Sequence, residues 1–551
     1  MFRAYHSRTA LRSITFAILA ALLCAHAADA QGTAPTVAFS FNTPGRSIND
    51  INDDHLAVSG SGTVVSVKNN WITVADSIGT VLRSEHISQF FGVEQPPDVQ
   101  CYDPRVLFDR RHNRFIVSFL RADVVDPQIL SSLFICCSST NSPLAPWHVY
   151  NLTQDVGPED LDFPQFSING HDLFLTLNLS PEIWQVDLAD CYAGNPSPRL
   201  QKHTFRLDAL SGYVVPTPVR MVEPDGDRAW FLVHYANMDE ARTVVSLASI
   251  AGAVANGTTV DSVFTLSTDI PYREPQSAVQ VPPIYFQTGP NWGPTSAYLH
   301  HGSIQFVLNN RYSETSVGIL YGSLPLNGTY PRDSVIHCVE ITPGSRVMAH
   351  GSIAYAGCTS PSGVNASVVA FNYVSPTELP STGVVYIDTL GHASTSATCN
   401  RSLAPPSVAF FVRGDYTGCV EHPAHPGEVW VQGASTSADG TMLSWVSRVE
   451  APCGTSGVEV ANREAAGEQI RVAPDHGGYR LLYTLDIPTP GDYTITLHNG
   501  LGQLMRQEHL HFNAGTWSDA LAIDDLPSGP YLFSLLHHGE RLGTEKVLVA
   551  R

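Results

Sequence analysis

Three aspartates stand at comparable positions in the sequence and could bring carboxylates together. Asp103 opens "DPRVLFD", Asp162 opens "DFPQFSI" and Asp415 stands in "GDYTGCV". Carboxylates that converge repel one another unless they accept backbone hydrogen bonds or bind a hard cation such as Ca²⁺. Each aspartate could instead cap the turn of its own hairpin. The sequence therefore predicts either a ligand or calcium site made of Asp103, Asp162 and Asp415, or three separate caps.

Two other polar segments resemble metal-binding patterns. "EHPAHPGE" (421–428) sets His422 and His425 between two glutamates, and zinc sites use such ligands. Prolines interrupt this segment, so a hairpin loop is the alternative interpretation. "DINDDH" (50–55) fits the start of a calcium-binding EF-hand loop, but His55 stands where that loop needs glycine. We interpret it as a loop that leads into the first β-unit.

The common catalytic signatures do not occur in the sequence. It contains no HExxH, GxSxG, Walker A or GxGxxG pattern. "TSADGTMLSW" is a single near match to the Asp-box of sialidases, and the three converging arginines of those enzymes cannot be picked out. A glycosidase needs two carboxylates at a fixed separation, and 51 acidic residues do not single out a pair. We therefore predict a binding protein, and a secreted hydrolase acting on glycans or peptides is the alternative.

Alternating β-hairpins must position these residues. Residues 102–120 alternate on both sides of the turn "DRRHN", and Pro104 is predicted to begin the first strand because it cannot donate to a ladder. Similar hairpins are predicted over 62–79, 161–179, 219–236, 295–310, 351–373 and 410–435. Almost no segment has the apolar period of a helix. The repeated units predict an all-β fold with a β-propeller of six or seven blades, and two β-sandwich domains are the alternative.

Several of these segments, taken together, resemble one family. The matching stretches include "CYDPRVLFDRRHNRFIVSFL", "CCSSTNSPLAPWHVYNL", "DFPQFSINGHDLFLTLN" and "RGDYTGCVEHPAHPGEVWVQG". They look like a family of secreted bacterial β-propellers, over about residues 47–435. That family has no settled catalytic activity. The resemblance therefore implies a fold and an extracellular location, and it implies no reaction.

Composition limits the classes of partner. The chain has 551 residues, too many for one ordinary domain, and 43% of them are hydrophobic. Its formal net charge is −20. A chain this acidic repels nucleic acid and anionic membrane surfaces, so we expect neither as a partner.

The N-terminus has the three parts of a signal peptide. Arg3, Arg8 and Arg12 precede an apolar run over 14–24, and "AHAADA" follows it. We predict a signal peptide over 1–30, with an uncleaved anchor as the alternative. No later apolar run is long enough to cross a bilayer, so we expect no transmembrane segment in the mature form.

Export permits disulfides. Ten cysteines minus Cys24 of the predicted signal peptide leave nine, so at least one thiol has no partner within the chain. We expect the pairs Cys338–Cys358 and Cys399–Cys419, as neighbours across strands.

The last residues read as a separate domain. Residues 454–469 are small and polar and predict a linker. Residues 470–551 contain short alternating strands with tight turns, which favours a small antiparallel β-sandwich. An adhesive or carbohydrate-binding sandwich would have the same strands.

This segment also resembles the C-terminal sorting domain of the bacterial type IX secretion system. The matching stretches are "DYTITLHNGLGQLM", "LPSGPYLFSL" and "EKVLVAR", with Gly502, Gly529, Tyr531 and Lys546 at the marked positions. The usual Pro-Asn-Pro start is replaced by "PDH". The resemblance implies that the outer-membrane type IX machinery delivers a propeller over 31–453 to the cell surface or the medium. There it would bind an unknown glycan or protein.

Overall fold

The computed structural model describes residues 33–549, apart from short internal stretches. Those stretches are 46–52, 95–98, 126–127, 154–160, 179–181, 206–215, 225, 235–239, 262, 276–277, 282–283, 289–294, 343, 361–363, 407–409, 412–413, 454–469, 475–479, 488, 500–502, 524 and 538–539. The chain divides into two compact units, Met1–Gly454 and Thr455–Arg551. The predicted signal peptide and the predicted linker lie outside the described residues.

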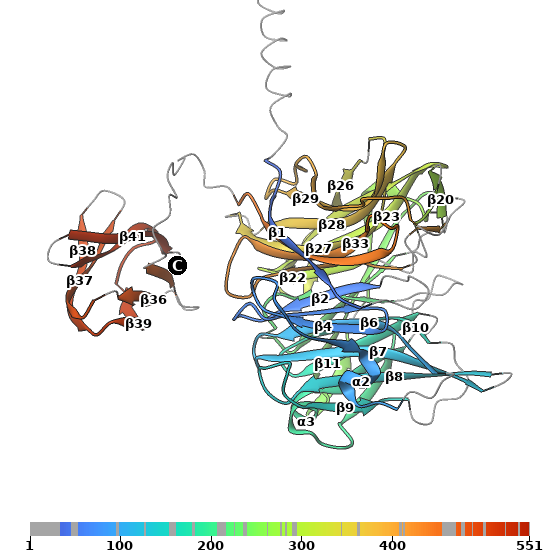
Figure 1. Cartoon of the computed structure of the whole chain (residues 1–551), viewed down its shortest axis with the longest axis horizontal. Helices are drawn as coiled ribbons and strands as arrows, with labels where there is room; N and C mark the ends of the chain where they lie inside the picture. Colours follow the sequence, from blue (N-terminus) through green and yellow to red (C-terminus); the bar gives the residue numbers. More distant parts are fainter. Residues whose placement is uncertain are drawn as a thin grey trace, which may run out of the picture. The chain divides into compact units, whose positions relative to one another are not determined.

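The first unit consists of antiparallel four-stranded sheets that follow one another along the chain (Figure 1). The first sheet contains β2 (Asp54–Val58), β3 (Val64–Lys68), β4 (Trp71–Ala75) and β5 (Val81–His86). The second contains β6 (Val99–Asp109), β7 (Arg114–Val125), β8 (Gln128–Ser138) and β9 (Trp147–Asn151). The third contains β10 (Asp162–Ile168), β11 (Asp172–Asn178), β12 (Glu182–Asp187) and β13 (Leu200–Thr204). The unit also has two short helices. α2 (Ile87–Phe91) follows the outer strand β5, and α3 (Leu188–Ala193) connects β12 to the outer strand β13.

The middle of this unit is one longer sheet made of two such groups. One group has the order β14 (Thr217–Pro218), β16 (Arg228–His234), β17 (Arg242–Ala253) and β19 (Phe264–Tyr272), with β18 (Gly257–Val260) beside β17. The other has the order β15 (Arg220–Met221), β22 (Ser296–His300), β23 (Ser303–Ser313), β24 (Ser316–Asn327) and β26 (Val335–Ile341), with β25 (Tyr330–Pro331) beside β24. A short parallel pairing of β19 with β26 joins them.

Two further sheets and a small one complete the unit. One contains β27 (Val347–Thr359), β28 (Asn365–Ser375), β29 (Glu378–Ile387) and β30 (Ala397–Arg401). The last contains β32 (Gly418–Glu421), β33 (Glu428–Thr436), β34 (Met442–Glu450) and β1 (Thr36–Thr43), so the first strand of the chain completes the final sheet. A small sheet contains β20 (Ala278–Val281), β21 (Ile284–Gln287) and β31 (Phe410–Phe411).

The first strands of the sheets form a closed ring. Each contacts the next in the order β2, β6, β10, β14, β22, β27 and β32, and β32 contacts β2 again. Apolar clusters fill the layers between neighbouring sheets: Val65 and Val67 of β3 share one with Val117 and Phe119 of β7. Each sheet is therefore buried on both faces, which explains nearly continuous apolar strands such as "VVSVK" in β3. The unit is an all-β, propeller-like ring of sheets.

Most predicted hairpins are confirmed by strand pairing. β6 pairs with β7, β10 with β11 and β22 with β23 in antiparallel register. The predicted position of Pro104 is wrong, because β6 begins at Val99 and the proline lies at a register shift inside the strand. The hairpin predicted over 219–236 is also different. Thr217 and Pro218 pair with β16, whereas Arg220 and Met221 pair in parallel with β22 of the next group.

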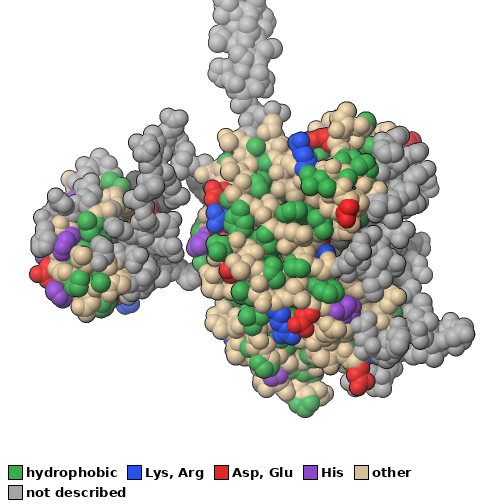
Figure 2. Space-filling model, viewed as in Figure 1, with side chains coloured by type: hydrophobic (Ala, Val, Ile, Leu, Met, Phe, Trp, Pro, Cys, Tyr) green, Lys and Arg blue, Asp and Glu red, His purple; other side chains and the backbone are tan. Residues whose placement is uncertain are grey.

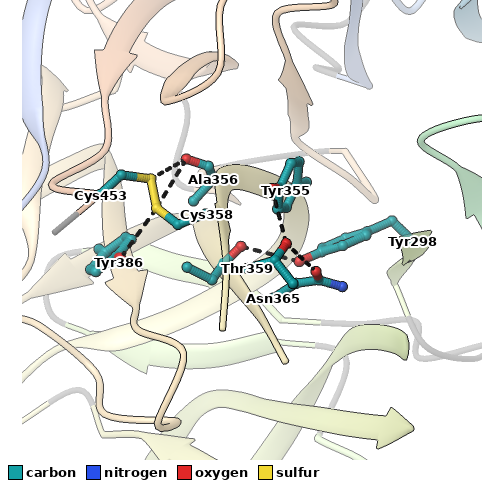
Figure 3. The surroundings of a disulfide bond; sticks show 9 residues. Tyr298, Tyr355, Ala356, Cys358, Thr359, Asn365, Tyr386 and Cys453 are labelled. Carbon is teal, nitrogen blue, oxygen red and sulfur yellow. Dashed lines mark hydrogen bonds between the residues drawn. A yellow bond between two sulfur atoms is a disulfide. The ribbon is translucent and has the colours of Figure 1, made fainter. Parts of the chain in front are cut away.

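The expected disulfides are wrong, and a different pair is bonded (Figure 3). Cys358 near the end of β27 is joined to Cys453, just beyond β34, with a Cα–Cα distance of 5.7 Å. Cys338, Cys399 and Cys419 are separate buried thiols. Cys453 was not expected as a partner because it reaches β27 only after the last sheet has packed beside it.

The second unit contains two antiparallel sheets around one apolar core. One sheet has β35 (Ile470–Pro474), β36 (Arg480–Ile487) and β39 (Gly515–Ala522). The other has β38 (Leu504–Phe512), β37 (Gly491–Asn499), β40 (Gly529–His537) and β41 (Glu540–Val549). Tyr483 and Leu485 of the first sheet pack with Ile495 and Phe533 of the second.

Two tyrosines have the same local geometry in this unit. Tyr493 donates a 2.7 Å hydrogen bond to the carbonyl of Thr489, and Tyr531 donates a 2.8 Å bond to that of Pro527. In each case the acceptor lies four residues earlier, as in a tyrosine corner. Of the other residues matched to the sorting domain, Gly529 begins β40, Lys546 of β41 pairs with Leu532, and Gly502 lies outside the described residues.

Candidate functional site

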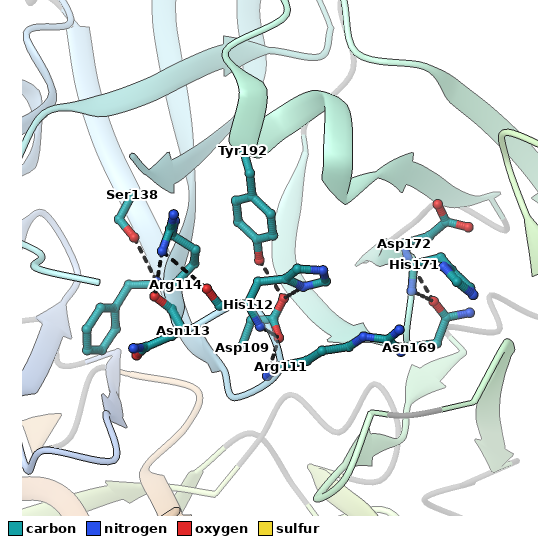
Figure 4. A network of polar contacts seen from close by, with 11 residues as sticks. Asp109, Arg111, His112, Asn113, Arg114, Ser138, Asn169, His171, Asp172 and Tyr192 are labelled. Carbon is teal, nitrogen blue, oxygen red and sulfur yellow. Dashed lines mark hydrogen bonds and ion pairs between the residues drawn. The ribbon is translucent and has the colours of Figure 1, made fainter. Parts of the chain in front are cut away.

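The turn of the hairpin over 102–120 is capped by a residue other than Asp103 (Figure 4). The carboxylate of Asp109 accepts bonds from the backbone N–H groups of Arg111 and His112, from His112 Nδ1 at 2.7 Å and from the Tyr192 hydroxyl at 2.7 Å. Burial acts to raise the pKa of Asp109, but these hydrogen bonds outweigh it and the pKa is lowered. In the next sheet Asn169 caps the corresponding turn. Asp103 and Asp162 therefore do not cap the turns of their hairpins.

The structure brings the three predicted aspartates together and adds a fourth. Asp103 Oδ2 accepts a 2.9 Å bond from the N–H of Phe163, which belongs to the neighbouring sheet. Asp53 Oδ1 accepts a 2.8 Å bond from the N–H of Asp415. We call Asp53, Asp103, Asp162 and Asp415 the aspartate cluster. The signal for Asp53 was the acidic run "DINDDH", which we interpreted as a loop.

Burial is the largest influence on the pKa values of Asp53, Asp103 and Asp415. It raises the pKa of Asp53 to about 8, together with the charge of Asp415. Burial, followed by the charges of Asp53 and Asp162, also raises the pKa of Asp103 well above its ordinary value. The pKa of Asp415 is raised by burial and by the charges of Asp103 and Asp162. Such carboxylates either share protons or are balanced by a cation.

The same backbone irregularity precedes a polar side chain in two neighbouring strands, β6 and β10. Asp103 has φ 50° and Phe163 has φ 49°, a left-handed conformation that costs energy for residues other than glycine. A proline follows each, and the ladder shifts register at each position. Arg105 and Gln165 come directly after these prolines in β6 and β10. The irregularity therefore sets the direction of two equivalent side chains.

Arg105 lies between the aspartate cluster and a cavity. Its guanidinium carbon lies 3.3 Å from the ring centroid of Tyr416, and its Nε donates a 3.0 Å bond to the carbonyl of Pro164. The Tyr416 hydroxyl in turn donates to the carbonyl of Pro104 at 3.1 Å. Burial lowers the pKa of Arg105, and the charges of the neighbouring acidic groups oppose that shift. Arg105 is thus a buried cation fixed by stacking and hydrogen bonding.

The cavity beside Arg105 is lined by the first strands of the sheets. Its lining includes His55 of β2, Arg105 and Arg110 at β6, Gln165 of β10, Pro218 of β14, Arg220 of β15, Ser296 of β22, Ser352 of β27 and Glu421 of β32. Its volume is about 80 Å³ measured by the centres of water-sized spheres. One water needs roughly 10–15 Å³ in this measure, so several waters or one small organic ligand fit.

Charged groups converge in this cavity in a way that sequence analysis missed. Glu421 Oε1 lies 2.5 Å from Arg220 Nη1 and 3.1 Å from Arg110 Nη2. Burial acts to raise the pKa of Glu421, but the charges of Arg220 and Arg110 outweigh it and the pKa is lowered. The described lining residues include three arginines, Arg105, Arg110 and Arg220, and one carboxylate, Glu421. Two signals were available in the sequence: Arg105 follows the Asp103–Pro104 pair, and Glu421 begins the segment "EHPAHPGE", which we interpreted as either a metal site or a hairpin loop.

Three polar atoms of cavity-lining residues are buried and have no hydrogen-bond partner among the residues that the structure describes. They are Arg105 Nη2, Gln165 Nε2 and Glu421 Oε2. The exposed fractions of these residues are 6%, 6% and 5%. Buried polar groups almost always have partners in folded proteins. The three atoms therefore indicate a place where water or a ligand completes the hydrogen bonding.

The structure bears differently on the two predicted metal sites, the segment 421–428 and the three aspartates. Among the described residues, three candidate ligand atoms lie within 4.8 Å of one another in the set His422, His425 and Glu428, and the aspartate cluster does not meet this criterion. His422 Nδ1, however, accepts the N–H groups of Ala424 at 3.0 Å and His425 at 3.1 Å. In this arrangement Nε2 carries the proton of the neutral ring, so neither ring nitrogen of His422 has a lone pair free for a metal. This supports the hairpin-loop interpretation, and calcium at Asp103, Asp162 and Asp415 stays a prediction.

The outer surface offers no comparable concentration of charge on the side seen in Figure 2. Acidic, basic and apolar side chains of the first unit are interspersed there. Within the part of the chain that the structure describes, no helix is long and apolar enough to cross a membrane. The buried polar groups around Arg105 thus remain the strongest candidate site.

Comparisons with known proteins give only distant similarities. No protein family and no curated protein matches the chain. Domains 1–2 of Drosophila Semaphorin 1b match with a TM-score of 0.35 and 9% identity, over 76% of this chain and 87% of that one. A protein of unknown function from Dyadobacter fermentans matches with a TM-score of 0.39 and 8% identity, over 76% and 100%.

An exo-1,5-α-L-arabinanase from a bovine ruminal metagenomic library matches with a TM-score of 0.27 and 12% identity, over 52% of this chain and 96% of that one. At these TM-scores the similarities carry no argument about function. Any functional conclusion must come from the cavity itself.

Proposed function

We propose that this chain is an exported β-propeller of seven blades whose axial cavity binds an extracellular ligand, a group on a glycan or a protein. The closed ring of first strands supports the blade number, with β1 completing the last blade. A type IX sorting sandwich over 470–551 would carry the protein to the cell surface or the medium. The support for export is the N-terminal charge and apolar pattern together with the C-terminal resemblance.

The observation that carries the binding role is the set of unpartnered polar atoms in the cavity. If this cavity were only part of the packed core, we would expect apolar side chains to fill it, because buried polar groups without partners cost free energy. Here Arg105 and Gln165 are held there by a strained backbone conformation in two neighbouring blades. Strained backbone conformations of this kind cluster at ligand-binding and active sites.

The alternative is a secreted hydrolase acting on glycans or peptides. Glu421 is the one acidic side chain among the cavity-lining residues that the structure describes. Its two arginine partners lower its pKa, so it stays ionised and is a poor general acid. The geometry therefore favours binding over hydrolysis.

The test is a glycan array and a panel of glycosidase and peptidase substrates, both applied to the purified mature protein. We expect array binding that Gln165→Met abolishes and no turnover above background. Turnover that the same variant abolishes would establish the hydrolase. A blank array together with a blank substrate panel would refute a ligand-binding cavity.

A further inference from the structure

We propose that the cavity recognises the carboxylate and an adjacent hydroxyl group of an acidic sugar. Arg105 Nη2 and Gln165 Nε2 would donate to the carboxylate, and Glu421 Oε2 would accept from the hydroxyl. This inference rests on the proposed function and names the class of ligand. It follows from the number, type and charge of the unpartnered atoms.

The first step is the pair of donors. Arg105 and Gln165 occupy equivalent positions after Pro104 and Pro164, so the same backbone irregularity presents one N–H group from each of two adjacent blades. Both donor atoms are buried and have no acceptor within the described part of the chain. A ligand that satisfies them must bring acceptor oxygens. A planar carboxylate has two oxygens for two donors, whereas a sulfate or phosphate would leave further oxygens without partners.

The second step is the charge. The described lining contains Arg105, Arg110 and Arg220 and one acidic residue, Glu421. Asp53, Asp103 and Asp415 also interact with Arg105, but burial raises the pKa of each and so disfavours their ionised forms. The pKa of His55 is held well below its ordinary value by burial and by the charges of Arg105 and Arg220, so this lining residue is neutral. An anionic group adds a favourable interaction in such a lining, and a cationic group is repelled.

The third step is the unpartnered acceptor. Glu421 Oε1 interacts with both Arg110 and Arg220, whereas Oε2 accepts no hydrogen bond from any described residue. A ligand donor is needed there, and it must be uncharged because an ammonium group would meet the two arginines. A sugar hydroxyl satisfies this condition. A carboxylate beside a hydroxyl is the pattern of a uronic acid.

The experiment measures the affinity of the full mature chain for sodium glucuronate by titration calorimetry. D-glucose is the neutral control, and N-acetylglycine supplies a carboxylate without hydroxyl groups. We expect glucuronate to bind at least tenfold more tightly than either control. Gln165→Met removes the donor without adding charge, and Gln165→Glu replaces it with an anion. Both should weaken glucuronate binding at least tenfold.

Gln89→Glu is the matched control, since Gln89 is exposed on α2, away from the cavity lining. It should leave binding unchanged. Melting curves show whether each variant folds. If Gln165→Glu does not fold, the affinity of Gln165→Met decides the test, because methionine keeps the side-chain volume of glutamine. Equal binding of glucose and glucuronate, or binding indifferent to both Gln165 variants, would overturn the acidic-sugar proposal. An array hit on a neutral glycan would do the same and leave the proposed function standing, whereas a blank array together with a blank substrate panel would remove both.

Discussion

The hydroxyl group of Ser444 donates a 2.6 Å hydrogen bond to the carboxylate of Asp54, although the two residues are 390 positions apart in the chain. Gln432 Nε2 donates to the same oxygen at 3.1 Å and to the carbonyl of Val67 at 3.0 Å. Asp54 begins β2 in the first sheet, and its partners lie in β33 and β34 of the last. These bonds join the two ends of the ring.

Asp54 should make the stability of the first unit depend on pH. Burial raises its pKa from 3.8 to about 6 despite the hydrogen bonds and the charge of Lys68. The folded state therefore binds the proton more tightly than the unfolded state. The free energy of unfolding should fall as pH rises through the window from about 4 to 6, by up to about 3 kcal/mol. Asp54→Asn should remove this part of the slope in denaturant titrations.

Asp439 provides the matched control with the opposite sign. Hydrogen bonds from Ser437 and Thr441 lower its pKa to about 2. The contribution of Asp439 to the free energy of unfolding is present above the pKa that it has in the unfolded chain. It is lost as pH falls from about 4 toward 2. Asp439→Asn should leave the slope between pH 4 and 6 unchanged. If Asp54→Asn also leaves it unchanged, Asp54 does not titrate in that window.

The calcium prediction can be tested on the aspartate cluster. Calcium bound by Asp103, Asp162 and Asp415 would balance the negative charge of carboxylates that the fold brings together. We expect calcium to raise the melting temperature of the mature protein. The double substitution Asp103→Ala and Asp162→Ala should weaken that rise. A melting curve that responds neither to calcium nor to a chelator would refute the prediction.

The disulfide should contribute substantially to the stability of the first unit. It joins Cys358 to Cys453 across a sequence separation of 95 residues. Closing a loop of this length restricts the unfolded chain, and the double variant Cys358→Ser with Cys453→Ser should lose about 4 kcal/mol. Chemical unfolding measures the loss, and peptide mapping without reduction should recover the linked pair. Recovery of Cys338–Cys358 instead would contradict the bond described here.

The C-terminal unit should direct export without supporting the ring of sheets. Truncation after Gly454 retains Cys453 and removes the unit Thr455–Arg551. We expect the truncated protein to melt close to the full-length protein and to accumulate in the periplasm of a host with a type IX system. The same tail fused to an exported reporter should carry the reporter to the surface. Surface delivery of the truncated protein would show that the tail is not the sorting signal.

The sequence alone determined the local elements. Alternation around polar turns predicted the hairpins β6–β7, β10–β11 and β22–β23, because a strand's side-chain period is a local property. The matched positions of Asp103, Asp162 and Asp415 left two interpretations open, carboxylates that meet or separate turn caps, and the sequence alone did not decide between them. Pattern reasoning failed at Pro104, where a register shift inside β6 replaces the expected strand start.

Only the tertiary structure decided which of these elements meet. Asp53 meets Asp415 because the first and last sheets become neighbours when the ring closes. Glu421 of β32 meets Arg110 and Arg220 because the ring brings β32, the end of β6 and β15 to one cavity. Cys453 reaches Cys358 because the last sheet packs beside the sheet of β27. The first strands are separated by whole sheets along the chain, so no local spacing encodes their contacts. Their convergence comes from burying both faces of every sheet, which forces successive sheets around one axis. The cavity and its unpartnered atoms exist only after that packing is complete.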